Sequence, residues 1–198
     1  MTPGPWYLED FQSGQVLVTP ARTLTETDVV TFAGWSWDTN PVHTDEVSAR
    51  DGRFGGRIAH GLLGMSVAMG LTSRLGVFEG SSIALLGVDD WRFHAPLRVG
   101  TTVRCRLTIL GARPTSNGDA GVLDRLFELL DEDDHVLQGG RIGLLVARRP
   151  HGTQRFPGAV DSQPMDTAVP PQPSERSDGC TDTAAGHSVA DPPPDGKP

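Results

Sequence analysis

Lysine, cysteine and long apolar runs are all scarce in this sequence. Its 17 Lys+Arg residues include a single lysine, Lys197, and 25 Asp+Glu residues bring the net charge to -8. This acidic balance argues against a nucleic-acid partner, because phosphate binding requires a basic face. The chain also lacks a Gly-rich loop with phosphate-binding spacing and any metal-ligand spacing. We therefore expect neither a nucleotide, nor another cofactor, nor a bound metal.

The cysteine count is consistent with a reducing environment. Only Cys105 and Cys180 are present, far apart in the chain, and one such pair forms neither a disulfide framework nor a zinc motif. Residues 1–11 lack the basic and apolar regions of a signal peptide. No apolar run approaches the roughly 20 residues that cross a bilayer. These features predict a cytoplasmic protein that does not enter a membrane.

A change in composition near Pro150 divides the chain. Residues 151–198 hold nine of the 16 prolines and few large apolar side chains. Such a segment buries too little surface to offset the entropy of ordering it. We predict one domain over residues 1–150 and a disordered, Pro-rich acidic tail over 151–198. A linear motif that binds a partner is the functional alternative for the tail.

The domain shows strand patterns on either side of one long helical pattern. Residues 58–76 are apolar nearly all round, which is typical of a buried helix. A shorter helix is predicted to begin after Thr25 or Thr27. Alternating or β-branched stretches predict strands over 15–25, 82–97, 101–114 and 121–149, the last folded back at the turn 131–134. A buried helix with antiparallel strands indicates an α+β fold, in which a sheet wraps around a central helix.

The stretch "SWDTNPVH", residues 36–43, contains the candidate chemistry. Pro41 restricts Asn40 to extended conformations, so the preceding helix should end near Trp37 and the chain should then bend. Asp38 and His43 would lie on opposite limbs of this bend, where they could hold one water molecule between them. Both groups exchange protons near neutral pH, as general acid–base catalysis requires. A polar surface turn without chemistry is the alternative interpretation.

Three motifs together resemble the MaoC-like dehydratase and (R)-specific enoyl-CoA hydratase family. They are "DTNPVH" at 38–43, "AHG" at 59–61, and "FHAPLRVGTT" at 93–102, in which Thr101 stands where the family usually has Asp. The resemblance extends over about residues 8–148. The first motif is fairly specific, and the other two support it.

The resemblance implies a hot-dog fold, a homodimer and a thioester substrate carried by coenzyme A or an acyl carrier protein. It also implies that Asp38 and His43 act as a dyad on one water molecule. The water would add across a trans-2-enoyl thioester to give an (R)-3-hydroxyacyl thioester, or leave in the reverse reaction, without a cofactor. Asp38 is our choice for the proton exchanged with the α-carbon, although the sequence does not assign the two roles.

Further residues are candidates for substrate binding. The Gly61 amide, at the start of the long helix, is our candidate for the thioester oxyanion, with tight helix packing as the alternative. Asn40 is grouped with Gly61 as a substrate-binding candidate. Arg53 and Arg57 are possible contacts for coenzyme A phosphates, although a solvated loop is the simpler explanation for them.

Two positions depart from the family pattern. Trp37 replaces the glycine common before the acid, and Met69 stands where some relatives place a serine that supports it, with Ser66 one turn earlier. His60 is expected to cap or pack rather than react, and no role is assigned to His94 or His135.

Two other functions remain open at this stage. One is a hot-dog thioesterase, which usually has a carboxylate on the central helix or its facing loop. Residues 61–76 contain no Asp or Glu, and this favours a hydratase. The other is a non-catalytic subunit that binds acyl thioesters.

Overall fold

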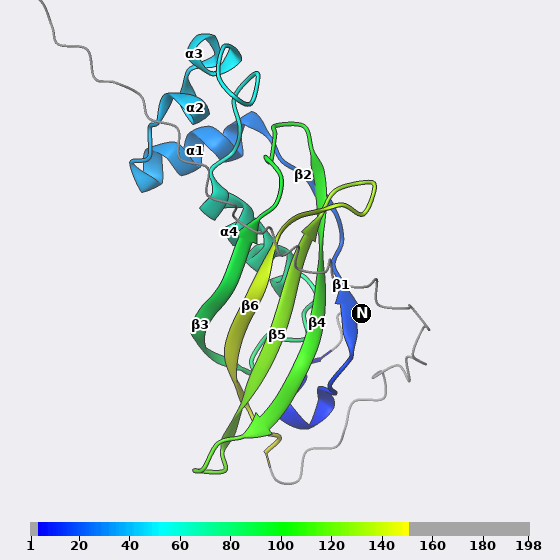
Figure 1. Ribbon diagram of the computed structural model, residues 1–198. Helices are drawn as coiled ribbons and strands as arrows, with labels where there is room; N and C mark the ends of the chain where they lie inside the picture. The colour runs from blue at the N-terminus through cyan, green and yellow to red at the C-terminus, as the bar shows by residue number, and fades with distance from the viewer. Residues whose placement is uncertain (1–3, 151–198) are drawn as a thin grey trace, which may run out of the picture. The chain divides into compact units, whose positions relative to one another are not determined.

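The computed structural model describes residues 4–150, which form one antiparallel sheet with helices at one end and on one face (Figure 1). The strands follow the order β1-β4-β5-β6-β3, and β2 pairs with β4 beside this path. The strands are β1 (Val16–Val18), β2 (Arg22–Thr23), β3 (Ser82–Phe93), β4 (Thr102–Pro114), β5 (Ala120–Leu130) and β6 (Val136–Ala147). The helices are η1 (Leu8–Asp10), α1 (Glu26–Ser36), α2 (Pro41–Thr44), α3 (Glu46–Arg50) and α4 (Gly61–Ser73).

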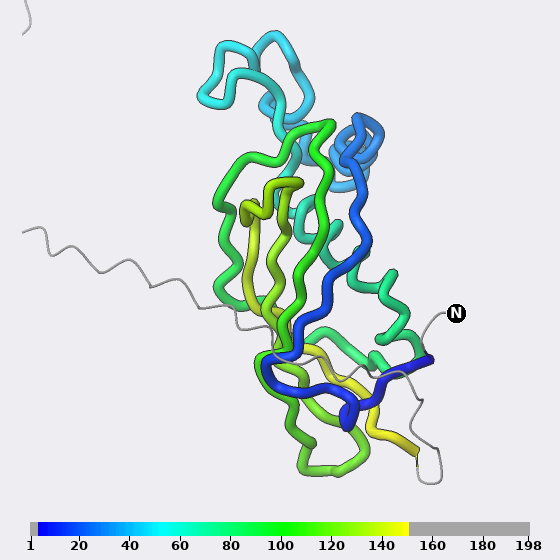
Figure 2. Tube along the Cα trace, turned by 90° about the vertical axis from the view of Figure 1, so that its right-hand side faces the viewer, coloured from blue at the N-terminus to red at the C-terminus, as the bar shows by residue number. Residues whose placement is uncertain are grey.

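The long helix α4 lies against one face of the sheet (Figure 2). Val67 and Leu71 of the helix belong to the same buried cluster as Leu107 of β4 and Phe127 of β5. Burial of such side chains is the main favourable contribution to folding. An antiparallel sheet wrapped around a central helix is the hot-dog arrangement, so the predicted α+β fold class is confirmed.

The prediction that α4 is buried all round is only partly right. Its buried residues are Leu63, Gly64, Val67, Ala68, Leu71 and Thr72. The opposite face is exposed and includes Leu62, Ser66 and Gly70. The sheet of a single chain can cover only one side of a helix, so the apolar character of the other side has no counterpart within residues 4–150.

The N-terminal elements follow their local signals. Residues 19–21, which include Pro20, separate β1 from β2, as expected of a proline at a sheet edge. Helix α1 begins after Thr25, whose hydroxyl accepts a hydrogen bond from the Asp28 amide, while the Asp28 carboxylate accepts one from the Thr25 amide. This reciprocal capping fixes the start of the helix.

Two glycines of α4 provide a matched test of the packing. A Cβ at Gly64 would lie 2.3 Å from the Gln138 side chain, whereas a Cβ at Gly70 would meet nothing within 4 Å. Gly64→Ala should therefore lower the free energy of unfolding by about 1–3 kcal/mol through overpacking. Gly70→Ala should raise it by up to about 1 kcal/mol, because alanine favours helix. Urea unfolding of both variants measures the difference, and equal effects would contradict this packing.

Cys105 is fully buried in β4, and burial raises the pKa of its thiol to about 12. In a Cys180→Ser variant, which leaves Cys105 as the only cysteine, iodoacetamide should label the native protein hardly at all at pH 8 and the denatured protein fully. The unfolded thiol ionises near its ordinary pKa of 9.0, whereas the folded thiol keeps its proton. The contribution of the Cys105 thiol to the free energy of unfolding is therefore fully present below pH 9, and it is lost as the pH rises from 9 to 12. Rapid native labelling would contradict this burial.

The predicted tail at residues 151–198 lies outside the described residues. Within residues 4–150, no helix has the length and apolar character needed to cross a membrane.

Candidate active site

The end of helix α1 leads into the loop that carries the motif. Trp37 caps the C-terminus of α1 and adopts a left-handed conformation with φ 63°. This conformation is the one that glycine adopts at many helix ends, and it costs a larger residue roughly 1–2 kcal/mol. The indole of Trp37 is 88% exposed, so burial does not offset this cost. Trp37, which stands where the family usually has glycine, is therefore conformationally unfavourable at the position directly before Asp38.

Asn40 and Pro41 start the next helix, which carries His43. The Asn40 side-chain oxygen accepts a hydrogen bond from the Val42 amide at 3.2 Å, and Pro41 occupies the first helical position. Both are favoured at a helix N-terminus. The side-chain oxygen of Asn40 thus caps α2, and this structural role alone explains an asparagine at this position. A contact between Asn40 and the substrate stays a prediction.

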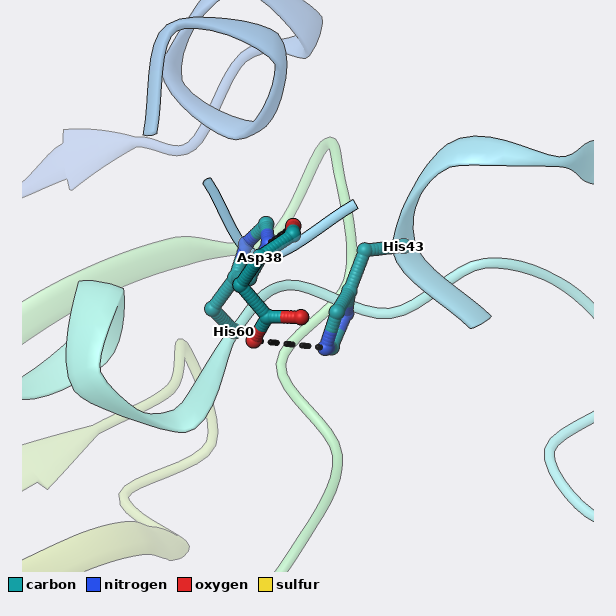
Figure 3. A group of neighbouring side chains, drawn as sticks. All are labelled: Asp38, His43 and His60. Carbon is teal, nitrogen blue, oxygen red and sulfur yellow. Dashed lines mark hydrogen bonds and ion pairs between the residues drawn. The ribbon is translucent and has the colours of Figure 1, made fainter. Parts of the chain in front are cut away.

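Asp38 and His43 face one another across the bend (Figure 3). The His43 Nε2 atom lies 4.0 Å from Asp38 Oδ2. The imidazole is 12% exposed and the carboxylate is 53% exposed. His43 Nδ1 donates a hydrogen bond to the Ile58 carbonyl at 2.7 Å. A carbonyl can only accept, so this bond fixes the proton on Nδ1 and leaves the Nε2 lone pair of the neutral ring facing the carboxylate.

His60 connects both members of this pair to the start of α4. It is 2% exposed, and its Nε2 donates to the Asp38 carbonyl at 2.9 Å. Its ring stacks on that of His43, with centroids 3.8 Å apart and planes inclined by 28°. The expectation that His60 packs describes its burial but misses these two contacts. The only sequence signal for these two contacts was the position of His60, directly before Gly61 at the start of the helix.

The carboxylate of Asp38 receives support from the backbone. The Asn40 amide donates to Asp38 Oδ1 at 3.4 Å. The hydroxyl of Ser66 donates instead to the Leu62 carbonyl in its own helix, and Met69 packs against the core. The bend itself thus provides a donor where some relatives use a serine.

Gly61 opens α4 and lies close to the ring of Phe93. A Cβ at Gly61 would lie 2.8 Å from the Phe93 Cε1 atom, so any larger residue here would have to displace the Phe93 ring. As the first residue of α4, Gly61 also belongs to the set of amides that have no acceptor inside the helix. Tight packing and an amide available to a ligand are therefore compatible.

The two arginines proposed for phosphate contacts differ. Arg57 forms a bidentate ion pair with Glu26 at 2.7 and 3.0 Å and a third bond to Glu46 at 3.1 Å. These bonds, the one to Glu26 foremost, raise the pKa of its guanidinium. Arg57 also donates to the His43 carbonyl at 3.5 Å and so braces the loop. Arg53, by contrast, is exposed in the loop before α4.

Asp38, His43 and His60 each place one potential metal ligand within 4.8 Å of the others. One nitrogen of each histidine ring donates to a carbonyl, so His43 Nε2 and His60 Nδ1 are the nitrogens left for a ligand or a proton.

Comparison with known proteins agrees with this architecture. Residues 10–124 match the family described as "MaoC like domain". The chain is 37% identical over 108 residues to a protein named (R)-specific enoyl-CoA hydratase from Rhodospirillum rubrum, covering 54% of this chain and 72% of the relative. It is 42% identical over 102 residues to Protein MaoC from Klebsiella aerogenes, covering 52% of this chain but only 30% of that longer protein.

A solved structure from Archaeoglobus, titled a monoamine oxidase regulatory protein, superimposes with a TM-score of 0.70 at 30% sequence identity. The match covers 76% of this chain and 99% of that one. The matched family region includes the Asp38–His43 bend, the start of α4 and most of the sheet. This chain belongs to the MaoC-like domain family.

Proposed function

We propose that this protein is a hydro-lyase that adds water to a trans-2-enoyl thioester, or removes it from an (R)-3-hydroxyacyl thioester. One observation supports this most strongly: the Nε2 lone pair of His43 faces the Asp38 carboxylate 4.0 Å away, in a partly open bend. A water molecule can bridge two groups at such a separation and exchange protons with both.

In the hydration direction, the water oxygen bonds to C3 of the enoyl group while a proton reaches C2. We assign the water proton to His43, because its Nδ1–H is bonded to the Ile58 carbonyl and its Nε2 is available as the base. His43 passes this proton across the gap to the Asp38 carboxylate, which delivers it to the α-carbon. Both groups then return to their starting state, and dehydration follows the same steps in reverse.

Negative charge develops on the thioester oxygen as C3 is attacked. The Gly61 amide, at the N-terminus of α4, is the proposed donor to this oxygen. A helix N-terminus combines unpaired N–H groups with the positive end of the helix dipole. Stacking of His60 on His43 would keep the dyad aligned with this donor.

The proposed substrate is carried by coenzyme A or an acyl carrier protein. Exposed Arg53 stays a candidate contact for its phosphates, whereas the guanidinium of Arg57 would first have to leave Glu26 and Glu46. A thioesterase is less favoured, because α4 carries no carboxylate. A reducing, cytoplasmic setting belongs to the same proposal.

A homodimer through β3 completes the proposal. Strand β3 forms one edge of the sheet and exposes a row of large apolar side chains: Ile83, Leu85, Leu86, Val88 and Phe93. A long apolar edge strand is a template for pairing with another strand. A second copy of β3 would satisfy its backbone and cover these side chains.

The proposed reaction can be tested by following the loss of conjugated absorbance when purified protein is mixed with crotonyl-CoA and longer trans-2-enoyl-CoAs. We expect turnover on at least one chain length. A protein that binds these thioesters without converting any of them would instead be a non-catalytic subunit.

A further inference from the structure

Strand β5 carries a charged side chain at a core position. Its inward-facing residues Leu123, Phe127 and Leu129 are fully buried and apolar, but Arg125, between the first two, is only 2% exposed. Burial lowers the pKa of its guanidinium to about 10, so the group is still protonated at neutral pH. A buried cation is costly unless charged or polar partners compensate it.

The partners found for Arg125 compensate it poorly. Its Nε donates to the Ile142 carbonyl at 3.2 Å, and its guanidinium lies 5.3 and 5.0 Å from the ring centres of Phe78 and Phe127. The buried Nη2 has no hydrogen-bond partner within residues 4–150. No carboxylate in that part of the chain forms an ion pair with Arg125, although ten other pairs are present there.

Arg125 also lines a pocket of about 270 Å³ between the C-terminal end of α4 and β3. The walls of this pocket are mainly apolar and include Met69, Phe78, Ile83 and Leu144. Ile83 belongs to the β3 row at the proposed dimer interface, so in the proposed homodimer the second copy would adjoin this side of the pocket. The hydroxyls of Thr72 and Ser73 on its helical side both donate to the Met69 carbonyl. The guanidinium is therefore the only cationic group among the pocket's lining residues.

The pocket is separate from the Asp38–His43 bend. Helix α4 starts beside the bend at Gly61, and Thr72 lies eleven positions further along the helix. At 1.5 Å per residue, this is about 16 Å along the helix.

We propose that this pocket binds the carboxylate end of a short apolar chain, with Arg125 as the counter-ion. An apolar cavity with one fixed charge is the usual form of a site for an amphiphilic small molecule. The carboxylate pairs with the guanidinium where Arg125 lines the pocket, and it supplies the charge that the core lacks. Two sources have this chemistry: a free short-chain fatty acid, and the far end of an acyl thioester that carries a second carboxylate.

Binding to the full-length protein tests the site directly. Titration calorimetry with octanoate should show saturable binding, whereas 1-octanol and octylamine, which have the same chain length, should bind at least about tenfold more weakly. This comparison needs no variant, because it contrasts only the charge of the ligand. Equal affinity for octanoate and 1-octanol, or no binding of octanoate, would overturn the proposal.

Arg125→Met removes the charge while keeping a long side chain. Replacing a buried charge by an apolar residue of similar size is often neutral or stabilising, so the variant should fold. Its octanoate affinity should fall at least about tenfold. Arg141→Met, at an exposed arginine on β6 paired with Asp124, is the matched control and should bind as the unaltered protein does. Unchanged octanoate binding by Arg125→Met would also overturn the proposal.

A turnover measurement distinguishes the two sources, and this part alone rests on the proposed function. If the acyl end is the ligand, trans-2-enoyl-CoAs with a terminal carboxylate should be preferred over methyl-ended ones of equal length, and Arg125→Met should remove the preference. Octanoate binding without such a preference would identify a free carboxylate as the ligand. A protein without hydratase activity would still give a clear result in the calorimetry, so the two proposals fail separately.

Discussion

Asp38→Asn is expected to lower turnover of trans-2-enoyl thioesters by about 10²–10⁴-fold, the usual contribution of a positioned acid–base group. The asparagine side chain has nearly the same shape, and its oxygen can still accept the hydrogen bond from the Asn40 amide. What it loses is the ability to exchange a proton. The loss should therefore appear in kcat, with the fold and the thermal unfolding temperature little changed.

The equivalent change at the base is His43→Asn. An asparagine amide can take the place of Nδ1 and donate to the Ile58 carbonyl, but nothing then replaces Nε2. We expect a loss as large as that of Asp38→Asn and little further loss in the double variant, because the two groups act as a unit.

Asp51→Asn and His94→Asn are the matched controls for these changes. Both residues are exposed and lie outside the proposed dyad. Steady-state kinetics of all variants measures the effect. Full activity in either dyad variant, or equal losses in the controls, would contradict the assignment of the dyad.

The second large effect concerns the exposed edge of the sheet. Leu86→Glu combined with Val88→Glu should dissociate the proposed dimer, raising its dissociation constant at least about a hundredfold, because each buried and unpaired charge costs several kcal/mol. The side chains are 52% and 46% exposed in the single chain, so the monomer should remain folded. Sedimentation should show a shift from twice the 21.2 kDa chain mass to the chain mass itself.

The opposite edge provides the control for this experiment. Val16 and Val18 of β1 are similarly exposed, at 48% and 52%, and the same pair of glutamates there should leave the dimer intact. If the glutamates on β3 leave the dimer intact and those on β1 dissociate it, the interface lies at β1 and the proposal is contradicted. A monomeric unaltered protein would rule out the homodimer altogether.

Much of the fold could be predicted because its signals are local. The start of α4 at Gly61, the capping of α1 at Thr25 and the turn between β5 and β6 each depend on residues a few positions apart. The short helices α2 and α3 were not predicted, since four or five residues are too few for a helical period to show. The exposed face of α4 was also missed, because periodicity shows that a face is apolar but not whether the same chain covers it.

The site was predictable in part, for a related reason. The spacing of Asp38 and His43 around Asn40 and Pro41 indicated a bend, and the two side chains do approach one another there. The stacking of His60 on His43 was not foreseen, because it joins two residues seventeen positions apart through tertiary contact.

Arg125 was missed because strand alternation around it is ambiguous. Leu126 and Phe127 are adjacent and both apolar, so the sequence does not show which parity of the strand faces the core. In the structure Phe127 faces the core, and Arg125, two residues earlier on the same face of the strand, is buried with it.

Hydration of crotonyl-CoA in D₂O by the purified protein tests the central claim most directly, with the product analysed by mass spectrometry and chiral chromatography and released thiol measured in parallel. The proposal predicts (R)-3-hydroxybutyryl-CoA with one deuterium at C2, no release of coenzyme A, and almost none of this product from Asp38→Asn. Release of free coenzyme A as the main reaction, or intact crotonyl-CoA after prolonged incubation of a dimeric, folded protein, would contradict it.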